Sequence, residues 1–266
     1  MTDSNRRELR FGGIGRLYGS AELEALSKAH FCVIGIGGVG SWAVEALVRT
    51  GIGKITLIDM DDICVTNINR QLHAHSESIG MQKIEAMRDR CLAINPDCEV
   101  TLLDDFLMLD NIRNYIQGFD YVIDCIDAVK EKAALIAHCK RNKIPVITTG
   151  GAGGQTDPSQ IQYGDVAKTT HDPLLAKVRY ILRKQYNFSD NPKRKFGVDC
   201  VYSTEQLVYP STDGTVCKAK QQAEGGKNMD CATGFGSATM VTGSFGFFAA
   251  SKAIRKYLDK QSKSSE

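Results

Sequence analysis

The sequence lacks any arrangement of cysteines that would crosslink it or hold a zinc ion. Nine cysteines are scattered along 266 residues, and the closest two are Cys91 and Cys98. No two stand at the C-x-x-C spacing of a zinc knuckle, and an odd number does not fit a disulfide framework. Residues 1–10 are polar and charged and do not resemble a secretory signal. We therefore expect a cytoplasmic protein without structural zinc.

Long apolar runs are also scarce. Residues 232–251 form an uncharged run that is just about long enough to span a bilayer. Glycines alternate with serines and threonines along this run, and Lys252 follows it at once. The resulting low hydrophobicity favours a buried helix packed on the core over a membrane contact. No stable membrane insertion is predicted.

Net charge is small, at +2, so the overall charge indicates no class of partner. Positive charge is concentrated between residues 177 and 195, where Asp190 alone opposes seven cations. These cations are Lys177, Arg179, Arg183, Lys184, Lys193, Arg194 and Lys195. Such a cluster is typical of a solvated helix and loop, or of a surface that contacts the phosphate backbone of a nucleic acid.

Short apolar runs alternate with helical patterns between residues 31 and 154. The apolar runs predict strands at 31–35, 54–58, 99–103, 121–125 and 145–149, with helices at 41–50, 80–94 and 129–141. This alternation predicts an α/β fold with a Rossmann-like, doubly wound and mostly parallel sheet. After Gly150 the pattern loosens, and polar loops are expected at 187–196 and 225–228. We therefore expect an irregular C-terminal extension.

A glycine-rich segment follows the first predicted strand. Gly35, Gly37, Gly38 and Gly40 fit the G-x-G-x-x-G pattern between that strand and a helix, which is the context the pattern needs. Glycines let the backbone approach a phosphate, and the helix dipole favours the anion. Asp59 ends the second strand, where a carboxylate commonly accepts hydrogen bonds from ribose hydroxyls. The pattern predicts a nucleotide or dinucleotide site, unless the turn serves helix packing alone.

Residues downstream of the turn distinguish between nucleotides. An NAD-dependent dehydrogenase would use the turn and Asp59, but it has no need for Arg70 and Lys83 to converge on a phosphate chain. Transfer of AMP to a carboxylate needs cations along the triphosphate and a carboxylate such as Asp127 to hold Mg²⁺. These residues therefore favour ATP-dependent adenylation over a dehydrogenase or a non-catalytic nucleotide-binding module.

With these motifs, residues 10–154 closely resemble the E1-like (ubiquitin-activating, ThiF/MoeB-type) superfamily. The resemblance implies Asp59 at the ribose, Asn67 and Arg70 at the phosphates, and Lys83 at the α- and β-phosphates. Gln71 completes the Asn-x-x-Arg-Gln pattern.

The resemblance also implies a metal site and a homodimer. It places Mg²⁺ at Asp127, although this residue could instead cap the helix that begins at Val129. The sequence departs from many relatives at Ala128, where they have Asn. An arginine near the N-terminus would reach the ATP across a homodimer, and we favour Arg16 over Arg10. A structural monovalent cation would be a further ligand.

Three C-terminal segments point to one family within this superfamily, and they extend the resemblance over nearly the whole chain. Residues 148–155, 197–205 and 229–236 resemble the tRNA threonylcarbamoyladenosine dehydratases. This implies ATP-dependent cyclisation of N6-threonylcarbamoyladenosine beside the anticodon of tRNA, with release of AMP and pyrophosphate. A cysteine desulfurase system would be a further partner. One adenylation domain is expected, with an N-terminal segment (1–30), a nucleotide-binding core (31–154) and a substrate- and dimer-facing extension (155–266).

Alternatives remain for the carboxylate that accepts AMP and for the residues that take part in ring closure. A sulfur-carrier adenylyltransferase usually holds zinc through two C-x-x-C pairs, and their absence weakens that alternative. Cys200 and Cys231 would be needed for a thioester intermediate, yet buried or incidental cysteines are commoner and ring closure needs no covalent step. His171 is either a general base or a structural residue at a helix start.

Overall fold

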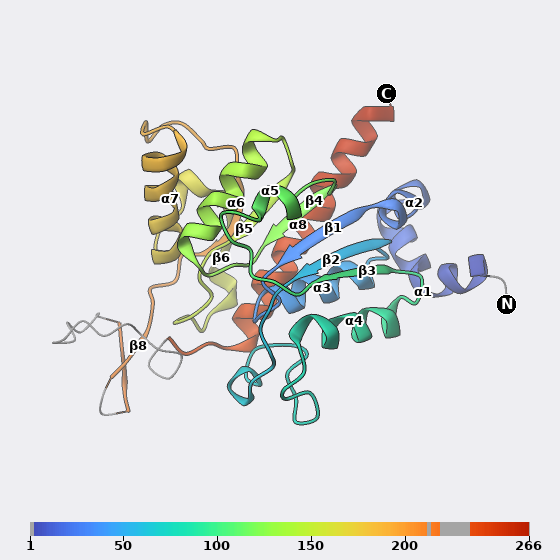
Figure 1. The fold of residues 1–266 in the computed structure, drawn as a ribbon, viewed down its shortest axis with the longest axis horizontal. Coiled ribbons are helices and arrows are strands. Elements are labelled where there is room, and N and C mark those ends of the chain that lie inside the picture. Colours follow the sequence, from blue (N-terminus) through green and yellow to red (C-terminus); the bar gives the residue numbers. More distant parts are fainter. Residues whose placement is uncertain (1–2, 212–213, 219–234, 266) are drawn as a thin grey trace.

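The computed structural model describes residues 3–211, 214–218 and 235–265. Seven strands in this part of the chain form one sheet in the order β3-β2-β1-β4-β5-β7-β6 (Figure 1). They are β1 (His30–Ile34), β2 (Lys54–Ile58), β3 (Glu99–Leu103), β4 (Tyr121–Asp124), β5 (Val146–Thr149), β6 (Ile161–Asp165) and β7 (Asp199–Ser203). Neighbours pair in parallel, except for antiparallel β6 and β7. The predicted α/β class with a doubly wound, mostly parallel sheet is confirmed.

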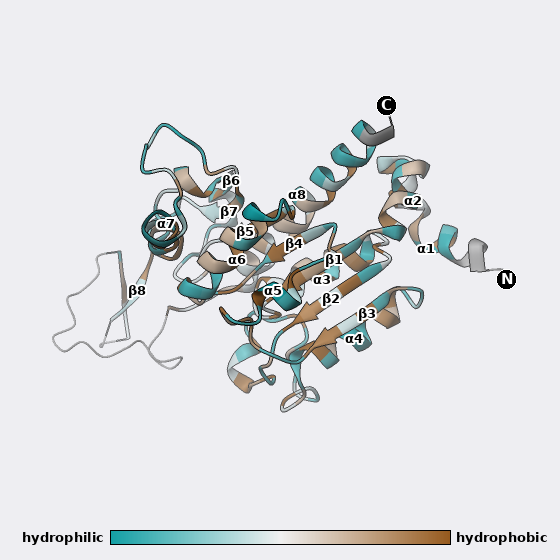
Figure 2. Cartoon of the chain, turned by 45° about the horizontal axis from the view of Figure 1, so that its top comes forward, coloured by the Kyte–Doolittle hydropathy of each residue, from teal (hydrophilic) through white to brown (hydrophobic). Residues whose placement is uncertain are grey.

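Helices cover both faces of the sheet. The main ones are α3 (Gly40–Arg49), α4 (Lys83–Ile94), α5 (Ile112–Tyr115), α6 (Val129–Arg141), α7 (Pro173–Tyr186) and α8 (Thr239–Ser265). Successive side chains of a strand point to opposite faces. On β1, Phe31 and Val33 therefore join the core under α3, α4 and α8, whereas Cys32 and Ile34 pack with α5 and α6. Figure 2 shows the hydrophobic strands between helices that are hydrophilic on their outer sides.

The glycine-rich run near the C-terminus lies on α8, which packs against α3. A Cβ atom at Gly246 would lie 2.5 Å from the Val39 carbonyl oxygen and 2.8 Å from the Ala43 nitrogen, so the two helices approach closely here. Glycine thus serves helix packing, and the predicted buried helix is confirmed for residues 239–251. Residues 232–234 of the run lie outside the described part. No helix among the described residues is long and apolar enough to cross a membrane.

The part after Gly150 is more regular than its sequence pattern predicts. β7 pairs with β5, and β6 forms the edge of the same sheet. β6 is only partly buried and reads Ile-Gln-Tyr-Gly-Asp, so it carries no strong apolar signal. A two-stranded ribbon of β8 (Tyr209–Pro210) and β9 (Val216–Cys217) follows. Short 3₁₀ turns η1 (Val65–Asn67), η2 (Pro158–Gln160) and η3 (Val166–Lys168) connect elements, and the loop predicted at 225–228 lies outside the described residues.

Two N-terminal helices lie at the amino ends of the strands. They are α1 (Asp3–Tyr18) and α2 (Ser20–Lys28), and β1 begins two residues after α2. The Gly53 amide donates to the Leu26 carbonyl, and the Lys54 amide donates to Ala29, which fixes α2 beside the start of β2. Figure 1 shows this pair at the end of the sheet opposite to the turn after β1.

Candidate nucleotide-binding site

The candidate site lies where the strand order reverses. β1 has β2 on one side and β4 on the other, so the loops that leave β1 and β4 diverge to opposite faces. In open α/β sheets this divergence leaves a crevice at the carboxyl ends of the strands. The glycine turn at residues 35–40 and the segment 125–128 both lie at this edge, as the sequence predicts.

At two positions of the turn, only glycine fits, because a Cβ atom would clash with the backbone nearby. Gly35 has a φ of 83°, and a Cβ there would lie 2.9 Å from the Cys125 carbonyl oxygen. A Cβ at Gly40 would lie 1.9 Å from the Gly35 oxygen. Gly37 and Gly38 instead face two predicted site residues, since a Cβ at these positions would lie 3.8 Å from Gln71 and 3.3 Å from Arg70. The fold therefore brings together the turn and the Arg-Gln pair.

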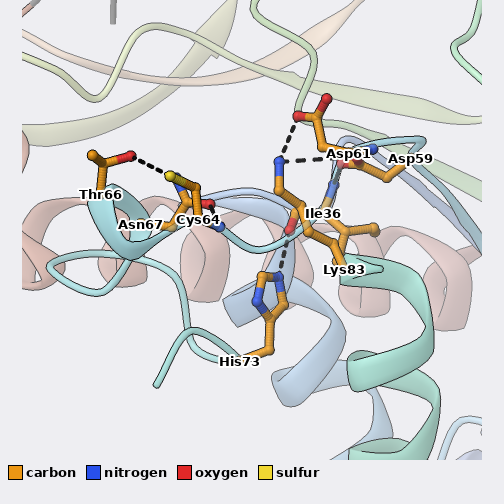
Figure 3. A network of polar contacts seen from close by, with 8 residues as sticks. All are labelled: Ile36, Asp59, Asp61, Cys64, Thr66, Asn67, His73 and Lys83. Carbon is orange, nitrogen blue, oxygen red and sulfur yellow. Dashed lines mark hydrogen bonds and ion pairs between the residues drawn. The ribbon is translucent and has the colours of Figure 1, made fainter. Parts of the chain in front are cut away.

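Asp59 holds the glycine turn through hydrogen bonds to backbone amides. Its carboxylate accepts hydrogen bonds from the Ile36 amide at 2.6 Å and the Asp61 amide at 2.9 Å (Figure 3). Burial raises the pKa of Asp59, and the nearby Lys83 opposes this shift. Each carboxylate oxygen can accept more than one hydrogen bond, so the geometry leaves acceptor capacity for a ribose hydroxyl.

Lys83 is buried at the first position of α4 and forms ion pairs with two carboxylates. Its Nζ lies 2.5 Å from Asp61 Oδ2 and 3.9 Å from Asp59 Oδ1 (Figure 3). The helix starts at Lys83 rather than at the predicted Gly80, because Gly80 has a φ of 86° and Gln82 is extended. Asp61 is thus a polar partner of the site to which the sequence analysis gave no role.

Asn67, Arg70 and Gln71 belong to the arm formed by residues 60–82. Asn67 Oδ1 accepts from the Cys64 amide at 3.0 Å, which closes the turn η1. Arg70 Nη1 donates to the Thr66 carbonyl at 2.8 Å, and its guanidinium has no ion pair in the described structure. Gln71 is buried, and its Oε1 has no hydrogen-bond partner among the described residues.

Asp127 is exposed in the loop between β4 and α6. The N-cap of α6 is Ala128, with no side-chain capping bond, so the alternative in which Asp127 caps this helix is wrong. Across the described residues, no group of three or more His, Cys, Asp or Glu side chains could by itself hold a metal ion. Asp127 would therefore share Mg²⁺ with phosphate oxygens and water, the usual arrangement for that ion.

A fully buried ion pair lies directly behind this loop and was not predicted. Lys132 Nζ lies 2.9 Å from Asp124 Oδ2, and both side chains are completely inaccessible. Thr148 Oγ1 accepts from Lys132 at 2.8 Å and donates to Asp124 at 2.7 Å, while Asp124 Oδ1 accepts from the Ile126 amide. Breaking such a pair would leave a charge unpaired in the core. This network fixes the start of the loop that presents Asp127.

Arg16 does not meet these residues within one chain. It is exposed in α1, at the amino ends of the strands, whereas the glycine turn lies at their carboxyl ends. Arg10, the alternative, donates to the Ile94 carbonyl at 3.0 Å. The role assigned to Arg16 therefore requires a second copy of the chain and stays a prediction.

The basic stretch divides into internal and exposed cations. Arg179 donates to Thr169 Oγ1 and Arg183 lies 5.5 Å from the centre of the Phe196 ring, and both are half-buried. The other five are exposed: Lys177 and Lys184 on α7, and Lys193, Arg194 and Lys195 in the loop that follows. A surface that contacts tRNA would therefore use the exposed five.

The structure also places the two remaining candidates for chemistry. Cys200 is buried in β7, and burial raises the pKa of its thiol strongly. This is the behaviour of a structural cysteine. Cys231 lies outside the described residues. His171 is exposed at a φ of 56°, directly before Asp172, which caps α7.

Comparison with known sequences decides the family. The sequence model of the ThiF family matches residues 13–266. The chain belongs to the ThiF family. Its sequence is 61% identical over 252 residues to the tRNA threonylcarbamoyladenosine dehydratase of Escherichia coli (strain K12), covering 94% of each protein. It is 62% identical over 264 residues to the dehydratase of the same name in Haemophilus influenzae, covering 98% of each.

Solved structures extend this similarity to the three-dimensional fold. This ThiF-family chain matches the crystal structure of E. coli tRNA N6-threonylcarbamoyladenosine dehydratase in complex with ATP with a TM-score of 0.87. The match covers 98% of both chains at 53% sequence identity. The similarity therefore includes the C-terminal extension as well as the nucleotide-binding core.

Proposed function

We propose that this chain uses ATP to dehydrate N6-threonylcarbamoyladenosine in tRNA to its cyclic form. The observation that carries the proposal is identity above 60% to two dehydratases over nearly the whole length of each protein, extension included. A relative with an ATP complex at 53% identity supports ATP as the nucleotide. The glycine turn, Asp59 and the arm with Arg70 are the residues through which we infer that the chain binds it.

The first step is adenylation of the threonyl carboxylate. A carboxylate oxygen attacks the α-phosphorus of ATP, the bond to the bridging oxygen breaks, and pyrophosphate leaves. The turn amides would bind the phosphates, and Arg70 and Lys83 would stabilise the charge that develops during transfer. Mg²⁺ at Asp127 would neutralise phosphate charge.

Lys83 must change partners if it is to bind the triphosphate. In the structure it is paired with Asp61 and Asp59. An anionic phosphate nearby would compete with Asp61, which is exposed and can be hydrated when released. Asp59 would keep its two backbone hydrogen bonds and remain at the ribose.

The second step closes the ring. The ureido group of the same side chain attacks the activated carbonyl, AMP leaves with the carboxylate oxygen, and a base takes the proton. Attack within one molecule needs chiefly positioning and exclusion of water. The buried state of Cys200 agrees with a route that has no thioester at this residue.

The test is incubation of the purified protein with tRNA that carries the threonylcarbamoyl modification, together with ATP and Mg²⁺. Mass spectrometry of the digested nucleosides should show the loss of one water from the modified adenosine, with one AMP formed per product. A reaction with an α,β-methylene analogue of ATP is the control, because its bond cannot be cleaved. Formation of an adenylate on a sulfur-carrier protein, with unchanged tRNA, would contradict the proposal.

A further inference from the structure

A hollow of about 370 Å³ lies between α7 and residues 206–209, with Lys218 beside them. Together with the first turn of α7, its walls include His171, Arg179, Gln206, Leu207, Tyr209 and Lys218. A volume of this size lies within the usual range for sites that bind small molecules. The predicted nucleotide residues do not line this hollow, so the proposed ATP site does not account for it.

The hollow is connected with the nucleotide site by a chain of contacts. Tyr209 packs against Phe235, with ring centroids 5.1 Å apart. The next two residues bind two separate segments: the Gly236 carbonyl accepts from the Gly154 amide at 2.8 Å, and the Ser237 carbonyl accepts from Asn69 Nδ2 at 2.9 Å. Asn69 directly precedes Arg70. One short segment, 235–237, therefore joins the wall of the hollow to the arm of the proposed ATP site.

The N-terminus of α7 is attached to the same edge of the sheet. Asp172 Oδ1 accepts from the Leu175 amide at 2.8 Å, and Oδ2 accepts from the Gly151 amide at 3.0 Å. Gly151 lies just beyond β5, the strand next to β4. Both oxygens of the one carboxylate among the described lining residues are thus used to hold α7 in place.

The cations of the hollow are left without carboxylate partners in the described structure. Arg179 donates to Thr169 Oγ1 and to the Val166 carbonyl at 3.4 Å, both neutral acceptors. Burial and the adjacent Arg183 lower the pKa of Arg179, and the Asp172 carboxylate partly opposes this shift without forming an ion pair with Arg179. Lys218 adds a second positive charge to the wall. An aromatic ring, an apolar side chain and unpaired cations suit a planar base that carries an anionic group.

We propose that this hollow receives the modified adenine nucleotide of the tRNA, with the base against Tyr209 and Leu207 and a phosphate flanking that nucleotide at Arg179. The inference rests on the proposed function, in which the enzyme must bind a modified nucleotide of the anticodon loop. Bases of single-stranded RNA loops are commonly bound by stacking on aromatic side chains. The anion at Arg179 is a phosphate, because the carboxylate of the modification has to reach the α-phosphorus of ATP.

The test measures the affinity for an anticodon stem-loop RNA carrying the modified adenosine, and for the same RNA with an abasic position there. Wild type should bind the first RNA more tightly. Tyr209→Leu should reduce that difference by about tenfold, the size of one base–aromatic stack. Tyr180→Leu is the matched control, because Tyr180 lies on α7 but is 63% exposed and does not line the hollow. Unchanged ATP affinity in both variants shows that they are folded.

Arg179→Gln tests the phosphate contact. If the variant loses only the preference for the modified RNA over RNA with plain adenosine, Arg179 binds the carboxylate and this arrangement is wrong. If Arg179 binds a phosphate, affinity falls equally for both RNAs. The inference is overturned if Tyr209→Leu and Arg179→Gln both bind the modified, abasic and plain RNAs as tightly as wild type does, while wild type converts the modified tRNA. Failure of wild type to convert that tRNA with ATP would instead overturn the proposed function.

Discussion

The residues of the candidate nucleotide site are connected by ion pairs and hydrogen bonds with one another in the absence of a ligand. Lys83 is shared by Asp61 and Asp59, and Asp59 in turn binds the glycine turn through the Ile36 amide. Removal of one member therefore changes the surroundings of the others. Because of this coupling, a substitution at one of these positions can change both activity and stability, so both must be measured for each variant.

Replacement of Lys83 or Asp127 by alanine should lower turnover at saturating ATP and Mg²⁺ by about a hundredfold or more, the usual cost of losing a group that stabilises transition-state charge. Formation of AMP is the readout, and the free energy of unfolding shows whether each variant folds. Lys130→Ala, at an exposed position of α6, is the control. Turnover within a few-fold of wild type would show that the assigned roles are wrong.

His73 should make stability dependent on pH. Burial lowers its pKa to about 4, against 6.5 for an unperturbed histidine. Between these values the unfolded chain binds more protons than the folded one, so the contribution of His73 to stability is full above about pH 6.5 and falls as the pH drops toward 4. The full loss, reached below about pH 4, is about 3.4 kcal/mol.

Urea unfolding at pH 7 and pH 5 checks this expectation. His73→Gln should lose less stability than wild type between the two values, because glutamine does not titrate. His75→Gln is the matched control, since His75 is exposed. Equal losses in wild type and His73→Gln would contradict the assignment.

The sequence predicts the residues of local motifs well and buried long-range partners poorly. The turn at 35–40 and Asp59 follow from a pattern that is local in the chain, and the fold places them together. Lys132 and Asp124 form a buried pair, but a lysine within a helical pattern gives no sign of which carboxylate will meet it. The engagement of Asp61 by Lys83 depends in the same way on the packing of α4.

At the scale of elements, α7 and its following loop provide two different surfaces. One side of α7 closes the hollow, whereas the loop at 187–196 presents three exposed cations to solvent. The sequence alone groups all seven cations in one patch, since it does not show that Arg179 and Arg183 turn inward. Strand β6 was missed for a related reason, because an edge strand lacks the apolar run by which the inner strands are recognised.

Reversal of Lys193, Arg194 and Lys195 to glutamate should weaken tRNA binding and flatten its dependence on salt, while ATP affinity stays unchanged. Removal of one cation from a phosphate reduces the slope of log affinity against log salt by about 0.7 to 0.9. The same positions changed to glutamine should give an intermediate effect, since charge is removed but not reversed. Identical slopes for wild type and the glutamate variant would assign the loop to a solvated face.

At the scale of the whole molecule, the site is incomplete if an N-terminal arginine belongs to it. α1 and α2 lie at the amino ends of the strands, and the crevice lies at the carboxyl ends. We infer that a homodimer brings Arg16 of one copy to the ATP of the other. This inference rests on the family resemblance, and the position of Arg16 in α1, at the opposite ends of the strands from the crevice, is consistent with it.

Mixing two inactive variants tests this arrangement. If Arg16 acts across the dimer, Arg16→Ala and Lys83→Ala chains mixed in equal amounts should restore about a quarter of wild-type activity, because half of random dimers are mixed and each has one intact site. The mixture is prepared by co-expression, and each variant alone is the control. Absence of recovery in a confirmed mixed dimer would show that Arg16 does not act across the dimer, and full activity of Arg16→Ala alone would place Arg16 outside the ATP site.

One residue in the glycine turn is held at both of its backbone polar atoms. The Ile36 amide donates to Asp59, and the Ile36 carbonyl accepts from His73 Nε2 at 2.8 Å (Figure 3). A carbonyl can only accept, so Nε2 carries the proton. Because Asp59 follows β2 and His73 comes from the arm, two separate parts of the fold prevent the peptide groups on either side of Ile36 from flipping. The turn that we propose as the phosphate-binding segment is therefore held in one conformation without a ligand, and little conformational entropy should be lost there if ATP binds to it.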